Sequence, residues 1–164
     1  MKILVLSDSH SGLHFMREAA DKLRPDVMIH LGDYYEDGQV MADEYPGIPC
    51  FQVPGNCDMF SCFSGEPDIL REEMDGVTFF LTHGHRHGVK RGTQCLLEAA
   101  RAAGADAVLY GHTHVSDCRR EPDGLWVLNP GSCRSASGSV GMILTEPGKI
   151  VSCLVLDSWD LDRL

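Results

Sequence analysis

Side chains that can bind metal ions follow five apolar segments of the chain, close to the point where each segment ends. Four of these five groups lie beside a glycine, which lets the backbone turn sharply and approach a ligand closely. Each group alone is typical of a turn, a cap or a surface position, so the set as a whole carries the prediction. The groups are Asp8-Ser9-His10, Gly32-Asp33, Gly55-Asn56, His83-Gly84 and Gly111-His112-Thr113-His114.

The residue types in this set suit a pair of divalent metal ions. Imidazole binds zinc, iron, manganese or nickel, whereas carboxylate and amide oxygens favour the harder members of that group. Seven ligands are too many for one ion, but they are enough for two ions if one carboxylate bridges them. Because alternate residues of an extended segment point the same way, Asp8 and His10 could share one metal. In a curved loop, His112 and His114 could instead bind different metals.

Short apolar strands alternate with amphipathic helices around these groups. The apolar periodicity predicts helices over 13–23 and 89–103, the second ending at Gly104, and a weaker helix over 37–44. The segments 68–74 and 77–82 are joined at Asp75-Gly76, which is a hairpin signal. We expect strands over 2–7, 26–31, 49–53, 68–74, 77–82, 106–110, 125–128, 139–145 and 149–156.

The order of these elements predicts an α/β (α+β) fold. Strand–helix–strand order at the start indicates parallel pairing, whereas the later strands joined by glycine turns indicate antiparallel pairing. A mixed sheet, or two packed sheets with helices outside, follows, in one domain over residues 1–164. In such folds the loops beyond the strand ends are where ligands bind.

Charge and composition exclude several classes of protein. The 164 residues include 24 acidic and 14 basic side chains, a net charge of −10, which argues against a nucleic-acid coat or a membrane-surface binder. No apolar run is long enough to span a bilayer or to form a signal peptide. The seven cysteines form no C-x-x-C pair, so we expect reduced thiols in a cytoplasmic protein rather than a zinc or redox module.

The ordered series D-x-H, G-D, G-N, H-G and G-H-T-H resembles the signature of the calcineurin-like metallophosphoesterase superfamily. The segment Asn129-Pro130-Gly131-Ser132 resembles a further part of that signature, so the resemblance covers nearly the whole chain. With the short chain and Gly55-Asn56-Cys57-Asp58, it is similar above all to the small bacterial and archaeal phosphodiesterases of the group. The resemblance implies two packed mixed β-sheets flanked by helices, with the metals at the strand ends.

The resemblance also implies a hydrolase with two divalent cations, Mn2+ first, with Zn2+, Fe2+, Ni2+ or Co2+ as alternatives. It would act on a small phosphate ester, a phosphodiester, by in-line attack of a metal-bridging hydroxide. Two carboxylates and one hydroxide leave two divalent cations with about one net positive charge, which attracts a phosphate despite the acidic chain. In the family pattern, the first metal takes Asp8, His10, Asp33 and His114, and the second takes the bridging Asp33 with Asn56, His83 and His112.

Five residues are candidates for catalysis or substrate binding, among them Asp33 and Asn56, which are also predicted ligands. Cys57 stands where many members of the family have a histidine that can protonate the leaving group, so it is either catalytic or only a small loop residue. His85 could support a ligand or meet the substrate. Asn56 and Arg134 could bind the substrate phosphate. We expect His14 and His30 to be structural.

Other functions stay open on the same residues. A phosphomonoesterase or nucleotide phosphatase would use the same metal core. A non-catalytic scaffold of this fold is the alternative from another class, and the complete set of seven ligands argues against it. The tail residues Trp159, Leu161 and Leu164 could cover the protein's own core or form a contact in a homo-oligomer.

Overall fold

The strand β1 (Lys2–Leu6) is buried on both faces because its alternate side chains enter two different apolar layers. Ile3 and Val5 pack into a core between two sheets. Leu4 and Leu6 point the other way, toward helices. The near-continuous apolar run at the start of the sequence is therefore that of a strand in the middle of a layered fold.

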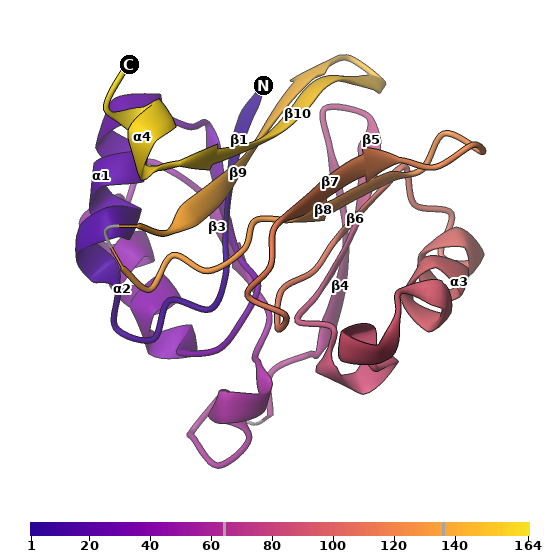
Figure 1. The fold of residues 1–164 in the computed structure, drawn as a ribbon, viewed down its shortest axis with the longest axis horizontal. Helices are drawn as coiled ribbons and strands as arrows, with labels where there is room; N and C mark the ends of the chain where they lie inside the picture. Colours follow the sequence, from indigo (N-terminus) through magenta and orange to yellow (C-terminus); the bar gives the residue numbers. More distant parts are fainter. Residues whose placement is uncertain (64, 136) are drawn as a thin grey trace.

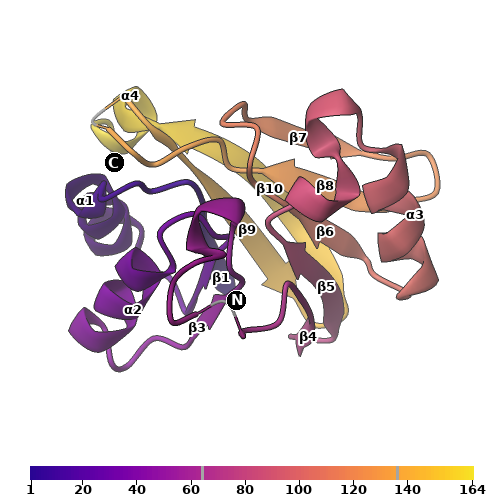
Figure 2. The same ribbon diagram turned by 90° about the horizontal axis from the view of Figure 1, so that it is seen from below.

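The computed structural model describes residues 1–63, 65–135 and 137–164. In the described chain, two five-stranded sheets pack face to face, and helices cover their outer faces (Figure 1). The view from below shows the same layers, with α1, α2 and α4 on one side and α3 on the other (Figure 2). This arrangement confirms the expected α/β fold with two mixed sheets and helices outside.

The first sheet has β1 at its centre and has the order β10-β9-β1-β2-β3. β1, β2 and β3 are parallel, whereas β9 is antiparallel to both β1 and β10. The other elements of this half are β2 (Val27–His30), β3 (Cys50–Gln52), β9 (Ser139–Glu146), β10 (Lys149–Asp157), α1 (Leu13–Leu23), α2 (Tyr35–Glu44) and α4 (Ser158–Leu161).

The second sheet has the order β4-β5-β6-β8-β7, and α3 covers its outer face. β5, β6 and β8 are parallel, while β4 and β7 pair antiparallel at the two edges. The predicted hairpin at Asp75-Gly76 joins β4 to β5. The elements are β4 (Ile69–Met74), β5 (Val77–Thr82), β6 (Ala107–Leu109), β7 (Asp117–Arg120), β8 (Trp126–Asn129) and α3 (Gln94–Ala102).

The predicted helix over 89–103 is wrong at its start. Val89–Arg91 form a separate short 3-10 turn, and α3 begins only at Gln94. Gly92 separates the two with φ 141° and ψ 160°, a conformation that no helix accommodates. One strand and one α-helix were not predicted, β7 because it is a polar edge strand and α4 because it is only four residues long. The short 3-10 turns Asn56–Asp58 and His85–His87 were not predicted either.

The C-terminal tail covers the protein's own core through one residue. Leu161 is fully buried in the apolar layer beneath α1, and its carbonyl accepts a hydrogen bond from Lys22 Nζ at 3.0 Å. Trp159 and Leu164 are 67% and 75% exposed, so they do not share that role. In the described part of the chain, no helix is both long enough and apolar enough to cross a membrane.

Gly141 lets the two sheets approach closely. It lies in β9 beside Val5, with which it pairs, and faces Leu128 of the second sheet. A Cβ atom at this position would lie 2.8 Å from Leu128 Cδ2 and 3.1 Å from Val5 Cβ. Because Leu128 is fully buried, its side chain has little room to move aside.

We predict that Gly141→Ala lowers the free energy of unfolding by about 1–3 kcal/mol, because it overpacks the contact between the sheets. Gly47→Ala is the matched control, since nothing lies within 4 Å of a Cβ atom there. Urea unfolding of both variants measures the difference. Equal stability of the two variants would show that the sheets can separate without cost.

Candidate metal centre

The carboxyl ends of the parallel strands β1, β2, β3, β5 and β6 lie at the same end of the molecule, the lower end in Figure 1. The loops that leave these strand ends carry all seven residues predicted as metal ligands. The first sheet supplies Asp8 and His10 after β1, Asp33 after β2 and Asn56 after β3. The second sheet supplies His83 after β5, and His112 and His114 after β6. The candidate centre therefore lies across the boundary between the sheets.

Four of these residues form a tight group. One ligand atom from each of Asp8, His10, Asp33 and His114 lies within 4.8 Å of the other three. His114 Nε2 is 3.1 Å from Asp8 Oδ1 and 3.4 Å from His10 Nε2. His10 Nε2 is 3.9 Å from Asp33 Oδ2. Two imidazoles and two carboxylates at these distances could hold one divalent cation.

A second group lies on the other side of the Asp33 carboxylate. His83 Nε2 is 3.4 Å from Asp33 Oδ1 and 3.2 Å from Asn56 Oδ1. The ring of His112 lies beside that of His83, with 5.0 Å between the ring centroids. The two oxygens of Asp33 thus face different sets of histidines, Oδ2 toward His10 and Oδ1 toward His83.

The second group contains a neutral His83 whose Nε2 atom carries a lone pair rather than a proton. Its Nδ1 is 2.7 Å from the carbonyl oxygen of Leu31, which can only accept, so Nδ1 must carry the proton. Burial lowers the pKa of His83 to about 3, and the ring is neutral at physiological pH. Its Nε2 lone pair therefore faces the oxygens of Asp33 and Asn56 with no proton between them. A cation there would turn this repulsion into attraction.

Asp8, in the first group, also has a carboxylate oxygen placed to bind a cation. Its Oδ2 accepts hydrogen bonds from Ser7 Oγ at 2.6 Å and from the His112 amide at 2.9 Å. Its Oδ1 is buried and accepts no hydrogen bond from any residue that the structure describes. Burial also raises the pKa of Asp8 to about 6, because the charged form is taken out of water. An orphaned carboxylate oxygen that points at imidazole nitrogens fits a bound divalent cation.

The backbone is strained where these side chains are held. Nine non-glycine residues among those described have positive φ, and five of the nine are predicted ligands. Such conformations cost of order 1 kcal/mol or more and persist where the surrounding structure imposes them, often at functional sites. The five are Asp8 (53°), His10 (44°), Asp33 (56°), His112 (69°) and His114 (59°).

Asp58, which was not predicted as a functional residue, fastens two of the ligand loops together. Its Oδ1 accepts from the amides of Tyr34 and Tyr35 at 3.1 and 3.0 Å, and its Oδ2 accepts from the amide of Gly55 at 2.7 Å. The loop of Asp33 is thereby joined to the loop of Asn56. Its position three residues after Gly55, as in a capping box, was the available signal.

Asp37 plays a similar part for the first loop. Its Oδ2 accepts from Ser9 Oγ at 2.6 Å and from the Ser11 amide at 2.8 Å, on either side of His10. His30 lies behind Ser9, with its Nε2 3.1 Å from the same hydroxyl, and is fully buried. Burial lowers the pKa of His30 to about 4, so it is a neutral ring in this network.

The other predicted site residues lie around the two groups. The Cys57 amide donates to Asp33 Oδ1 at 2.9 Å. Partial burial and the neighbouring Asp33 carboxylate raise the pKa of the Cys57 thiol to about 11. The ring of His85 lies 5.4 Å from that of His83 and 6.1 Å from that of His112, centroid to centroid. Arg134 is exposed. Burial of His10 is the main cause that lowers the pKa of that histidine, and the positive charge of Arg134 lowers it further.

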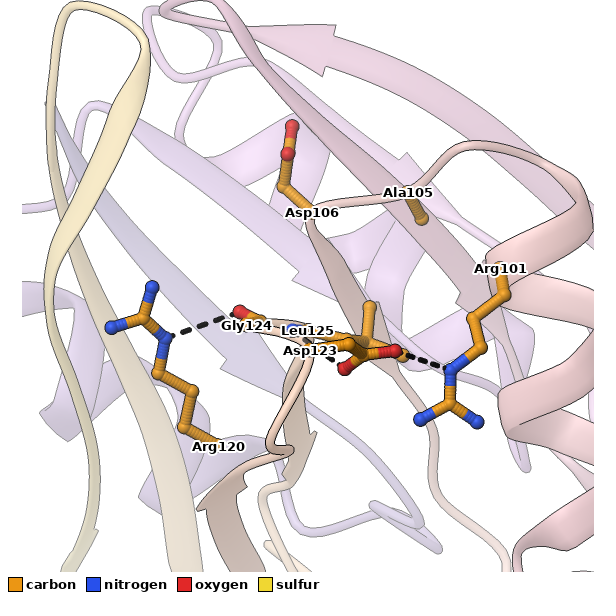
Figure 3. A pocket seen from close by; sticks show the side chains of 7 residues that line it. All are labelled: Arg101, Ala105, Asp106, Arg120, Asp123, Gly124 and Leu125. Carbon is orange, nitrogen blue, oxygen red and sulfur yellow. Dashed lines mark hydrogen bonds and ion pairs between the residues drawn. The ribbon is translucent and has the colours of Figure 1, made fainter.

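A separate cavity of about 330 Å³ lies at the opposite end of β6 (Figure 3). Its polar groups already have partners within the chain. Arg101 Nε donates to Asp123 at 2.6 Å, and Arg120 Nε donates to the Gly124 carbonyl at 3.1 Å. Because neither sign of charge is in excess, nothing in this cavity selects a ligand. Its lining consists of Arg101, Ala105, Asp106, Arg120, Asp123, Gly124 and Leu125.

Comparison with known proteins agrees with this arrangement. Residues 1–147 match the model of the calcineurin-like phosphoesterase superfamily domain. A probable metallophosphoesterase of Mycoplasma pneumoniae is 37% identical over 135 residues, covering 80% of this chain and 78% of that protein. A phosphodiesterase of Methanocaldococcus jannaschii is 32% identical over 164 residues, covering 89% of this chain and 94% of that protein.

Solved structures share the fold. A predicted phosphoesterase of Streptococcus pneumoniae superposes with a TM-score of 0.74 at 26% identity, over 96% of this chain and 89% of that one. Vps29 of Entamoeba histolytica, in a structure complexed with zinc, superposes with a TM-score of 0.69 at 19% identity. That match covers 96% of this chain and 99% of Vps29 and concerns the fold alone.

We predict that divalent metal stabilises the folded chain. A cation bound only by the folded state adds about 2.7 kcal/mol at a hundred times its dissociation constant, a rise in Tm of about 5–10 °C. Thermal unfolding of chelator-treated protein, with and without excess Mn2+, measures this rise. Asp8→Asn should reduce the shift, and an unchanged Tm in the wild-type protein would contradict a metal site.

Proposed function

Because the chain belongs to the calcineurin-like phosphoesterase superfamily, we propose that it hydrolyses a phosphodiester with the help of two divalent cations. The observation that carries the proposal is the position of the Asp33 carboxylate. Its two oxygens face two separate groups of imidazole nitrogens, 3.9 Å from His10 and 3.4 Å from His83. A carboxylate so placed can bridge two ions.

The ligand sets follow from the two groups. The first cation would be held by Asp8, His10, Asp33 and His114. The second would be held by Asp33, Asn56, His83 and His112, with Asn56 offering its Oδ1 beside His83 Nε2. When bound, the cations, with Mn2+ as the first candidate, would lower the pKa of a water molecule and stabilise the charge on the phosphoryl oxygens.

The chain's own residues prepare this chemistry. Leu31 fixes the tautomer of His83 through its carbonyl, so that Nε2 faces the centre. The carboxylates of Asp58 and Asp37 accept hydrogen bonds from backbone amides of the loops that carry the candidate ligands. These bonds preserve the distances on which in-line attack depends. His85 has a buried Nδ1 with no hydrogen-bond partner among the described residues, and its ring lies beside that of His112, so it is well placed to contact a substrate beside the second group.

Two residues would interact with the phosphate or the leaving group. Arg134 is exposed near His10 and can pair with a phosphate oxygen. The Cys57 thiol, with a pKa of about 11, remains protonated at neutral pH and gives only a weak hydrogen bond. The leaving group therefore departs with little help from a proton donor.

The preference for a diester rests on the relative from Methanocaldococcus jannaschii, which is named a phosphodiesterase. The test is hydrolysis of an activated aryl phosphodiester and of the matching monoester, with protein purified without chelator and assayed with Mn2+. We expect a higher kcat/KM for the diester. Faster monoester hydrolysis would replace the phosphodiesterase with a phosphomonoesterase, and hydrolysis of neither ester would contradict an enzymatic function.

We predict that Asp33→Asn lowers kcat/KM by about 100-fold or more, because the substitution removes the bridging negative charge. Asp43→Asn, at an exposed position of α2, is the control and should leave the rate unchanged. Both variants are assayed with metal at saturation. Turnover of the Asp33 variant near that of the control would contradict the two-metal assignment.

We predict a steep fall in rate as the pKa of the leaving group rises, because Cys57 is a weak proton donor. Cys57→His should flatten this dependence, since general acid catalysis is typically worth about 10²–10⁴-fold for poor leaving groups. Cys57→Ala should change little. The measurement is a series of esters at one pH with the wild-type protein and both variants. A large loss in Cys57→Ala on every ester would instead assign the thiol an essential role.

A further inference from the structure

Two cysteines contact each other across the boundary between the sheets. Cys118 lies in β7, the edge strand of the second sheet, and Cys153 lies in β10, the edge strand of the first. Their sulfur atoms are 3.4 Å apart, and Cys118 Sγ is 3.2 Å from the Cys153 carbonyl oxygen. A bonded pair of sulfurs lies about 2.0 Å apart, so closure by about 1.4 Å would join them.

The two thiols differ in exposure. Cys118 is exposed, and the contact between its sulfur and that of Cys153 is only partly buried, so a small oxidant can approach it from solvent. Cys153 is buried, 7% exposed, and burial raises the pKa of its thiol above the ordinary value. The exposed thiol is therefore the one that reacts first with an oxidant, and the buried thiol is the one that follows.

We propose that Cys118 and Cys153 form a reversible oxidation site, at which a hydroperoxide converts the pair into a disulfide that links the two sheets. The Cys118 thiolate attacks the O–O bond, forming a sulfenic acid and releasing an alkoxide, or hydroxide when the oxidant is hydrogen peroxide. The Cys153 sulfur then attacks the Cys118 sulfur, and its proton leaves with the departing hydroxide as water.

The balance of this sequence is complete. Two thiols are oxidised by two electrons, the hydroperoxide is reduced to an alcohol or water, and one further water is released. The reverse step needs a thiol reductant, which exchanges with the disulfide through a mixed disulfide. No metal and no residue of the candidate metal centre takes part, so the oxidation site is independent of the proposed function.

The position of the pair gives the crosslink a structural effect. Cys118 is paired with Leu128 in the ladder between β7 and β8, and the adjacent Asp117 is paired with Asn129. The Asn129 side chain donates to the Gly111 carbonyl at 3.0 Å and to Thr113 Oγ1 at 2.9 Å. Oxidation would thus fasten the first sheet to the strands that support the loop of His112 and His114.

Peptide mapping tests the proposal directly. Cleavage after arginine and lysine places Cys118 alone in the peptide 102–119 and Cys153 alone in the peptide 150–163. After treatment of the purified protein with hydrogen peroxide, we expect these two peptides as one linked species, two hydrogens lighter than their sum. A reductant should release both peptides, and the oxidised protein should remain a monomer on a non-reducing gel.

Thermal unfolding provides a second measurement. A disulfide that closes a loop of about 35 residues should raise the Tm by about 5–15 °C, and a reductant should reverse the rise. Cys118→Ser, a change at an exposed position, should abolish both the linked species and the shift in Tm. Cys95→Ser is the matched control, because Cys95 is also exposed but lies in α3, and it should leave both unchanged.

Three results would overturn the proposal. The first is over-oxidation of Cys118 to a sulfinic or sulfonic acid without a linked peptide. The second is a link from Cys118 to another cysteine, or a link only between two molecules. The third is a disulfide between the peptides 102–119 and 150–163 without any change in Tm. That result would show that the bond places no restraint between the sheets.

Discussion

The concentration of lone pairs around Asp33 is the constraint on which the rest of the structure depends. Two carboxylates and several imidazoles bring their ligand atoms within a few ångströms of one another, and Asp8 Oδ1 accepts no hydrogen bond from the described part of the chain. Such an arrangement opposes folding on its own, because buried charges and facing acceptors lose their hydration. The hydrogen bonds that loop amides donate to the carboxylates of Asp37 and Asp58 hold the backbone in place against this repulsion.

Neither sheet contains this centre by itself. Asp33 comes from the first sheet and His83 from the second, and their contact at 3.4 Å exists only because the sheets pack at a fixed separation and angle. That packing depends on apolar side chains such as Val5 and Leu128 and on the absence of a side chain at Gly141. The distances between the candidate ligands at the strand ends therefore depend on how the apolar core packs between the sheets.

Most of the strands, and the loops that bring the candidate ligands together, could be predicted from the sequence because both depend on local patterns. The apolar run of β1 and the glycines beside Asp33 and Asn56 are visible without a structure. The start of α3 was not predictable from periodicity, since Gly92 interrupts an otherwise regular apolar face. The contact of Asp58 with the Gly55 amide follows a local pattern, but its contacts with the amides of Tyr34 and Tyr35 could not be predicted, because these lie in another loop. Positive φ at the candidate ligands has only a weak signal in side-chain type, since aspartate and histidine adopt it more often than most residues but only at a minority of their positions.

The central position of β1 sets the order in which the chain can assemble. β1 pairs on one side with β2, which follows it closely, and on the other side with β9, near the opposite end of the sequence. The amino group of Met1 donates to the Thr145 carbonyl across 144 positions. Closing so long a loop is entropically costly, so contacts of this kind slow folding. On the ribosome, one edge of β1 stays unpaired until the residues of β9 have also emerged.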